Sequence, residues 1–286
     1  MANNQNESWT TIIRPRTGWF DIDLHELWQY RDLIWMFVKR NFTVLYKQTI
    51  LGPAWVLLNP LITTIIFNVI FTGIANIPTD GVPSFLFYMA GNTVWTLFAN
   101  CINNTANTFV ANAGVMGKVY FPRLTVPISQ VLTALLNFGI QLVMFLCFWV
   151  FFAVSDPGCV HFTIWLLYLP VLLLEVLMLG LGVGIIVSSL TTKYRDLAIA
   201  VGFGVQLWMY GTPVVYPLSM ISNPLLRAVM IANPMTAPME SFRAVCFNSG
   251  EVSVLMWVVS LAWTVLLLGV GISLFGKVEK TFVDTV

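Results

Sequence analysis

Charged residues are scarce in this sequence. Only 9% of the 286 residues are Asp, Glu, Lys or Arg, whereas 58% are hydrophobic. The surface of a soluble domain needs about a quarter charged residues, so the composition excludes an ordinary soluble fold. The formal net charge is only +1, and the basic residues gather in a few places, which argues against nucleic acid as a partner. We therefore expect lipid to solvate the chain.

Residues for metal, disulfide and phosphate chemistry are also few. The four cysteines lack CxxC spacing and there are two histidines, so no metal site is predicted. A disulfide between Cys159 and Cys246 would need an oxidising compartment, and we favour unpaired apolar cysteines. The phosphate-binding pattern GxxxxGK[ST] is absent; the nearest stretch, 114–119, lacks the earlier glycine and the hydroxyl residue. We expect no ATPase site on this chain and no enzyme domain.

Long apolar runs make up most of the chain. A helix needs about 20 apolar residues, at 1.5 Å each, to cross a hydrocarbon core of roughly 30 Å. We predict an all-α integral membrane protein with six transmembrane helices, over 53–75, 84–104, 125–154, 162–190, 197–216 and 252–275. The predicted organisation is an N-terminal segment (1–51), a six-span transmembrane domain (52–275) and a C-terminal tail (276–286).

The basic residues orient these spans. Lys and Arg mark the cytoplasmic side because they resist translocation. Of the 14, all but Arg227 and Arg243 lie before the first span, after the second or fourth span, or in the tail. The first twenty residues lack the apolar core of a cleavable signal peptide. Both termini are therefore predicted to be cytoplasmic.

The segment before the first span has the pattern of an amphipathic helix. Apolar residues recur at helical spacing from Leu24 to Leu45, and charged residues take other positions. This predicts a basic helix on the inner membrane surface, which includes Glu26, Trp28, Arg31, Lys39 and Arg40. The pattern leaves open whether the helix is a lipid anchor or a mechanical, gating element.

Residues 217–251 are too interrupted to cross a membrane. Four prolines, at positions 217, 224, 234 and 238, separate short apolar runs. We predict one or two re-entrant or interfacial helices on the outer side. Because irregular backbone at membrane depth is buried in protein or lines an aqueous cavity, this segment is expected to shape an exit.

Glu175 is the one carboxylate deep inside a predicted span. An ionised acid is costly there, so the side chain should face the bundle interior. One interpretation is a transport or proton-relay role, and the other is a protonated or hydrogen-bonded packing residue. We favour packing because no second buried acid, histidine or lysine accompanies it.

Polar and aromatic residues mark several spans. Asn100, Asn103, Asn104 and Asn107 recur at three- and four-residue intervals, which indicates either helix-to-helix hydrogen bonding or a wet translocation path. Aromatic residues can stack on sugar rings, but tryptophan and tyrosine also gather at membrane interfaces, which we favour for any single residue. The candidates for a substrate path are Phe67, Phe71, Tyr88, Trp95, Asn100, Asn104, Trp208, Tyr210 and Tyr216.

Stretches in four regions carry a resemblance to a known family. They are 46–60 (YKQTILGPAWVLLNP), 118–123 (KVYFPR), 194–197 (YRDL) with 212–217 (TPVVYP), and 233–235 (NPM). In order and position they resemble the type 2 ATP-binding-cassette permeases that export polysaccharide and polyol phosphate. The resemblance covers nearly the whole chain and is nearest to O-antigen permeases, with teichoic-acid and capsule permeases as close relatives. Lys47 and Gln48 depart from the residues that relatives often have.

The resemblance implies a transport subunit without its own ATPase site. It implies a homodimer in the bacterial inner membrane, two copies of a soluble ATPase subunit of the Wzt type, and a lipid-linked glycan as cargo. No cofactor is expected on this chain, and ATP and Mg²⁺ would bind the partner. The family's contacts with the ATPase subunits correspond to Gly117, Lys118, Tyr120, Phe121, Pro122 and Arg123, and to Tyr194, Arg195 and Asp196.

Two other classes of membrane protein are alternatives. A membrane glycosyltransferase needs carboxylates or bases clustered at one membrane face, and the outer acids are scattered in sequence. An ion-coupled secondary transporter is disfavoured because Glu175 has no charged companion in the spans.

Overall fold

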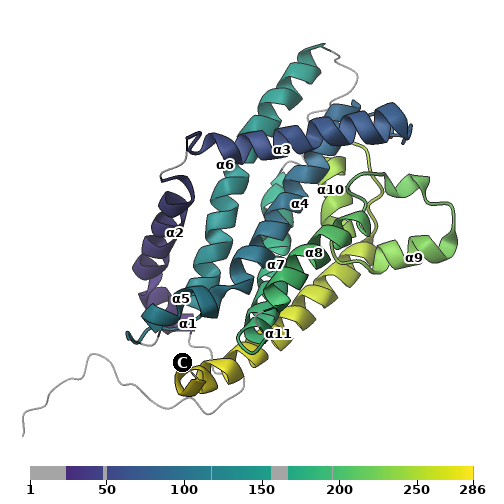
Figure 1. Cartoon of the computed structure of the whole chain (residues 1–286). Coiled ribbons are helices and arrows are strands. Elements are labelled where there is room, and N and C mark those ends of the chain that lie inside the picture. The colour runs from purple at the N-terminus through teal and green to yellow at the C-terminus, as the bar shows by residue number, and fades with distance from the viewer. Residues whose placement is uncertain (1–23, 48–49, 117, 156–166, 195, 286) are drawn as a thin grey trace, which may run out of the picture.

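The computed structural model describes residues 24–47, 50–116, 118–155, 167–194 and 196–285. Every regular element in these ranges is a helix, and the helices form one bundle (Figure 1). The chain is a multi-pass integral membrane protein, because five of the described helices are long and apolar enough to cross a membrane. They are α3 (Ala54–Phe67) with its continuation η1 (Asn68–Ile74), α4 (Ser84–Ala106), α6 (Thr125–Ser155), α7 (Leu169–Thr191) and α11 (Val254–Thr285).

These five helices match five of the six predicted segments. Four of them begin within about two residues of the predicted start, and α11 continues ten residues beyond its predicted end. For the predicted segment 162–190, residues 162–166 lie outside the described residues. Each of these helices is an apolar run long enough to cross a membrane. Length and hydrophobicity are the properties from which the spans were predicted.

The predicted segment 197–216 is helical only as far as Tyr210, so the prediction of a continuous helix is wrong over its last six residues. Helix α8 (Leu197–Tyr210) has 14 residues and is therefore about 21 Å long. It ends because Pro213 has no N–H to donate to the carbonyl of Met209, and because a residue before proline, here Thr212, disfavours helical geometry. Residues 211–217 continue as turns and extended backbone.

The remaining helices are short. They are α1 (Leu24–Gln29), α2 (Arg31–Tyr46), α5 (Thr108–Met116), η3 (Leu218–Met220), α9 (Pro224–Ala232) and α10 (Thr236–Phe247). Helices form where the amphipathic pattern predicted one, with a break at Tyr30, and α9 and α10 are helices of the interrupted segment 217–251. Helix α2 packs against α6. The positions of α2, α9 and α10 relative to a membrane stay predictions.

Helix α4 is the central helix of the bundle. It contacts α3, α6, α7, α8 and α10. Of the residues in its apolar 18-residue stretch, 78% are buried, whereas the corresponding share is 22% in α3, α6 and α11. It is also the least apolar of the five long helices. The least apolar span is therefore the one that protein covers most completely, as expected for polar groups that do not suit lipid.

Helix α7 lies between α4 and α11 and packs closely on both. A Cβ atom added at Gly184 would lie 2.7 Å from the Cβ of Thr105 on α4, and one added at Gly182 would lie 2.9 Å from the backbone nitrogen of Leu268 on α11. Small residues on alternate faces of α7 thus let three backbones approach, which is how helices pack where lipid removes the hydrophobic driving force.

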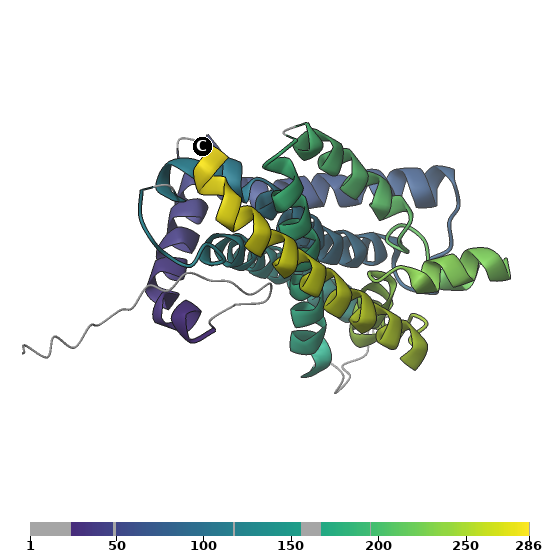
Figure 2. The ribbon, with the colours of Figure 1, turned by 90° about the horizontal axis from the view of Figure 1, so that it is seen from below.

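The two ends of the bundle differ. The turns before α6 and before α8 and the C-terminal end of α11 lie at the lower end in Figure 1, whereas α9 and α10 lie toward the other end. Viewed from below, α11 lies across the bundle in front of α7, and α1 and α2 stand to one side (Figure 2). The two turns and the C-terminal end of α11, where the sequence places lysine and arginine, thus share one end of the molecule.

Candidate functional site

A cavity of about 450 Å³ lies between the end of α2 and helices α3, α4 and α6. Six carboxamide side chains line it, and they come from three different helices: Asn59, Asn92, Asn100, Asn104, Asn137 and Gln141. On α4 the polar residues recur every four positions, at 92, 96, 100 and 104, so they form one stripe along the helix. We call this space the amide cavity.

Hydrogen bonds hold part of the cavity wall. The Tyr46 hydroxyl donates to Asn137 Oδ1 at 2.8 Å, and burial raises the pKa of this phenol, so it stays a neutral donor. Asn92 Nδ2 donates to the Pro60 carbonyl at 3.1 Å and so links α4 to α3. Gln141 is 4% exposed, and its Oε1 has no hydrogen-bond partner among the described residues.

The structure divides the predicted asparagine face. Asn100 and Asn104 line the amide cavity, whereas Asn103 and Asn107 are exposed elsewhere on α4 and at its end. Asn59, Asn92, Asn137 and Gln141 were missed as candidates. Asn92, Asn137 and Gln141 lie in the middle of apolar spans, which is the signal that could have found them, because polar residues there face the bundle interior.

The predicted aromatic residues pack mainly in the core. Phe67, Phe71 and Tyr88 form a cluster with ring centroids 5.5–6.4 Å apart. Trp95 and Trp208 each contact Phe98, at 5.4 and 5.2 Å. Tyr210 is 48% exposed, and Tyr216 donates a hydrogen bond to its carbonyl at 2.9 Å. None of these aromatic side chains lines the described part of the amide cavity, and their role in a substrate path stays a prediction.

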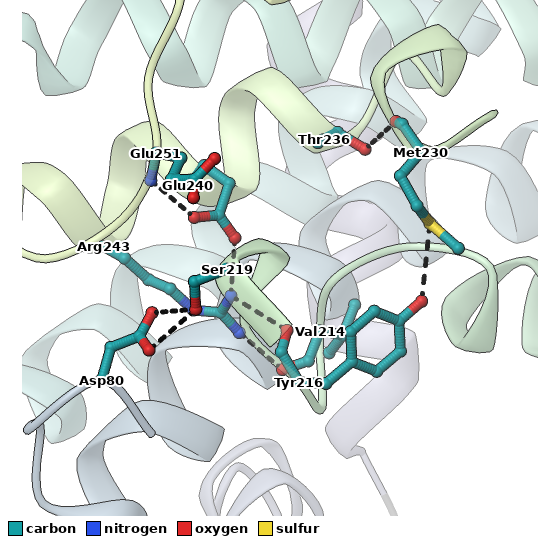
Figure 3. A network of polar contacts seen from close by, with 9 residues as sticks. All are labelled: Asp80, Val214, Tyr216, Ser219, Met230, Thr236, Glu240, Arg243 and Glu251. Atoms are coloured by element: carbon teal, nitrogen blue, oxygen red, sulfur yellow. Dashed lines mark hydrogen bonds and ion pairs between the residues drawn. The ribbon is translucent and has the colours of Figure 1, made fainter. Parts of the chain in front are cut away.

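A network of buried polar side chains binds the backbone that follows the end of α8 (Figure 3). Arg243 and Glu240 are each 1% exposed, and Arg243 Nη1 donates to Glu240 Oε1 at 2.9 Å. Arg243 Nη2 donates to the Val214 carbonyl at 2.7 Å, and its guanidinium lies 3.8 Å from the ring centre of Phe87. The Arg243 side chain thus supplies a hydrogen-bond donor to backbone that follows the end of α8 and has left the helix. Irregular backbone at membrane depth needs such partners, because lipid offers none.

Asn233 holds the start of the same stretch. Its Nδ2 lies 2.7 Å from the Gly211 carbonyl and 2.8 Å from Thr212 Oγ1. Its Oδ1 accepts hydrogen bonds from Trp208 Nε1 and from the backbone N–H of Met235. The NPM stretch therefore joins the segment that holds α9 and α10 to the end of α8.

The loop between α5 and α6 has an exposed tip and a buried base. Lys118, Val119 and Tyr120 are exposed, whereas Phe121 is buried and lies 5.8 Å from Phe37 of α2. The Tyr120 hydroxyl donates to Glu26 Oε1 at 3.3 Å. Arg123 binds the side chain and the backbone carbonyl of Glu279 on α11. The structure therefore joins this predicted contact loop to α1, α2 and α11.

The other predicted contact residues are less constrained. Tyr194 and Asp196 are exposed at the turn before α8, while Gly117 and Arg195 lie outside the described residues. On α1 and α2, Trp28, Arg31 and Lys39 are exposed, and Arg40 donates to Asn112 Oδ1 on α5 at 3.0 Å.

Of the two cysteines considered for a disulfide, the structure describes one. Cys246 is buried and free, and Cys159 lies outside the described residues. Within the described ranges, no group of three or more His, Cys, Asp or Glu side chains could hold a metal ion.

Comparison with known proteins gives a consistent result. A family profile described as ABC-2 type transporter matches residues 32–247. The "O-antigen export system permease protein RfbA" of Myxococcus xanthus is 29% identical over 266 residues, which cover 92% of this chain and 98% of that protein. Two proteins of the same name from Klebsiella pneumoniae are 26% and 27% identical over 257 residues, which cover 88% of this chain and 94% of each relative. The profile match spans most of the bundle, and this chain belongs to the ABC-2 type transporter family of membrane proteins.

Proposed function

We propose that this chain is the membrane subunit of an ATP-driven exporter that moves a lipid-linked, O-antigen-like polysaccharide from the cytoplasm across the inner membrane. The observation that carries the proposal is that relatives named as O-antigen export permeases align along 94–98% of their own length. The sequence has no phosphate-binding loop, so ATP and Mg²⁺ would bind a soluble ATPase partner. Teichoic acid or capsular polysaccharide is the alternative cargo.

The proposed topology has six crossings, with α8 as the fifth. Five crossings would put the N-terminal segment and the C-terminal tail on opposite sides, yet both carry lysine or arginine residues, which mark the cytoplasmic side. Helix α8 covers about 21 Å. Residues 211–217, in turns and extended backbone that Asn233 and Arg243 bind, would cover the remainder. Both termini are then cytoplasmic, and α9 and α10 are re-entrant helices on the outer side.

The proposed contact with the ATPase is the α5–α6 loop, together with the turn before α8. Its exposed tip can insert into a partner, and its base is fixed by Phe121 and Arg123. A loop built in this way passes a rigid displacement to the helices that hold it, since packed interfaces switch between discrete arrangements. A homodimer with two ATPase copies completes the proposed complex.

The proposal predicts association and export together. Co-expression with its cognate ATP-binding-cassette subunit should give a stable complex that hydrolyses ATP and that restores surface polysaccharide in a strain lacking its own permease. A complex whose ATPase carries a substitution of the phosphate-binding lysine is the control, and it should assemble without exporting. Failure to associate would contradict the proposal. Export that stops when the proton gradient collapses while ATP stays high would instead support an ion-coupled transporter.

A further inference from the structure

The amide cavity selects its occupant first by charge. No Asp, Glu, Lys, Arg or His is among its described lining residues. A phosphate or carboxylate group is best bound by cationic side chains, whereas each carboxamide of this wall presents an acceptor oxygen beside its donors and carries no charge. The chemistry of the wall therefore fits a neutral ligand.

The wall also has unused hydrogen-bonding capacity. Gln141 Oε1 is buried and has no partner among the described residues, although buried polar atoms are nearly always paired. The carboxamides of Asn59, Asn100 and Asn104 make no side-chain hydrogen bond to another described residue, yet they line the same space. A carboxamide both donates and accepts, and a sugar hydroxyl does the same, so the two groups are complementary.

An aromatic ring supplies the remaining feature of a carbohydrate site. Trp55 lies at the cavity and is 44% exposed, close to the apolar side chains of Leu45 and Val56. A flat apolar ring beside polar groups matches the apolar face and hydroxyl edge of a sugar ring. The volume of about 450 Å³ falls within the range of about 300–1,000 Å³ that is usual for small-molecule sites.

We propose that the amide cavity binds a neutral, hydroxyl-rich sugar ring. One hydroxyl of this ring donates a hydrogen bond to Gln141 Oε1, and the ring stacks on Trp55. The inference rests on the proposed function, in which the ring belongs to the polysaccharide cargo. A neutral hydroxylated lipid headgroup has the same chemistry, so the experiments must separate these two sources.

The first experiment compares two identical substitutions on α6. Gln141→Leu removes the acceptor in the cavity, whereas Gln130→Leu changes a half-buried glutamine on the same helix that does not line it. Export of polysaccharide by the complete complex should fall roughly tenfold for Gln141→Leu, as expected for the loss of one well-placed hydrogen bond. Complex assembly should stay unchanged in both variants, and basal ATP hydrolysis should stay unchanged in the control Gln130→Leu. Equal export by the two variants overturns the proposal.

The second experiment identifies the occupant and does not depend on activity. A photoreactive benzoylphenylalanine at Thr63, which lines the cavity, is irradiated in cells that make the polysaccharide and in cells that do not. An adduct that an antibody against the polysaccharide detects, in the first cells only, supports the proposal. An adduct with phospholipid alone, or no adduct in either case, overturns it.

The two experiments also separate this inference from the proposed function. If the unchanged complex exports polysaccharide but Gln141→Leu exports equally and Thr63 gives no glycan adduct, only the cavity assignment fails. If the unchanged chain neither binds the ATPase nor exports, the proposed function itself fails.

Discussion

Among single residues, Glu175 shows how hydrogen bonds accommodate a buried acid. The Pro234 carbonyl receives no helical hydrogen bond from residue 238, which is a proline, and the Ser260 hydroxyl lies 2.8 Å from it. Glu175 Oε1 lies 2.8 Å from both Ser260 Oγ and Thr264 Oγ1. The hydroxyl groups of Ser260 and Thr264, both on α11, donate to this oxygen, so the buried carboxyl group of Glu175 has hydrogen-bond partners inside the bundle. This geometry favours the packing interpretation over a proton relay.

These two hydrogen bonds predict which substitution the site tolerates. Glu175→Gln keeps both, because its amide oxygen can accept from Ser260 and Thr264, so the apparent melting temperature of the purified protein should change little. Glu175→Ala removes both and should cost about 1–3 kcal/mol, measured as a lower melting temperature in detergent. A folded Glu175→Gln protein that has lost export would instead indicate the proton-relay role.

At the scale of helices, the glycines of α7 predict where packing is tightest. Gly184→Ala would bring a Cβ within 2.7 Å of the Thr105 Cβ, which cannot rotate away. The substitution should destabilise the protein by roughly 1–3 kcal/mol through separation of α4 and α7. Gly269→Ala on α11 is the matched control, because no atom lies within 4 Å of its added Cβ. Thermal unfolding of the two variants checks this, and equal stability would contradict the packing argument.

Helices were also the best-predicted feature of the fold, and α8 shows why that success had a limit. The apolar runs of the other five spans coincide with helices, since length and hydrophobicity are local properties. In 197–216 the same run continues past Tyr210, but Gly211 and Pro213 stop the helix. Those breakers were present in the sequence. The role of Arg243 could not be read from the local sequence, because this residue binds the backbone after α8 from 27–29 residues further along the chain.

The amide cavity was predictable only in part for the same reason. Asn100 and Asn104 stood out because their spacing is visible within one helix. Asn137 and Gln141 have the same four-residue spacing on α6, but which face of α6 meets α4 depends on packing across the bundle. Local pattern finds a polar face, and tertiary contacts decide which faces share a cavity.

For the whole molecule, the six-crossing topology predicts the side of each loop. In a chain whose native cysteines are replaced, Lys193→Cys before α8 should react with a membrane-impermeant maleimide only in inside-out vesicles. Ser222→Cys, which is exposed before α9, should react only in spheroplasts. Reaction of both positions from the same side would show that α8 does not cross, and the predicted orientation would then be wrong.

The double attachment of residues 211–217 has a mechanical consequence. Asn233 and Arg243 bind two points of this stretch, so hydrogen bonds join the end of α8 to α10 and to the turn before it. In the proposed six-crossing topology, a displacement of Tyr194 or Asp196, just before α8, would therefore also displace α10 on the opposite side of the membrane. Under that topology α8 would couple the two sides as one rigid body, and opening on the outer side would need no signal other than movement on the inner side.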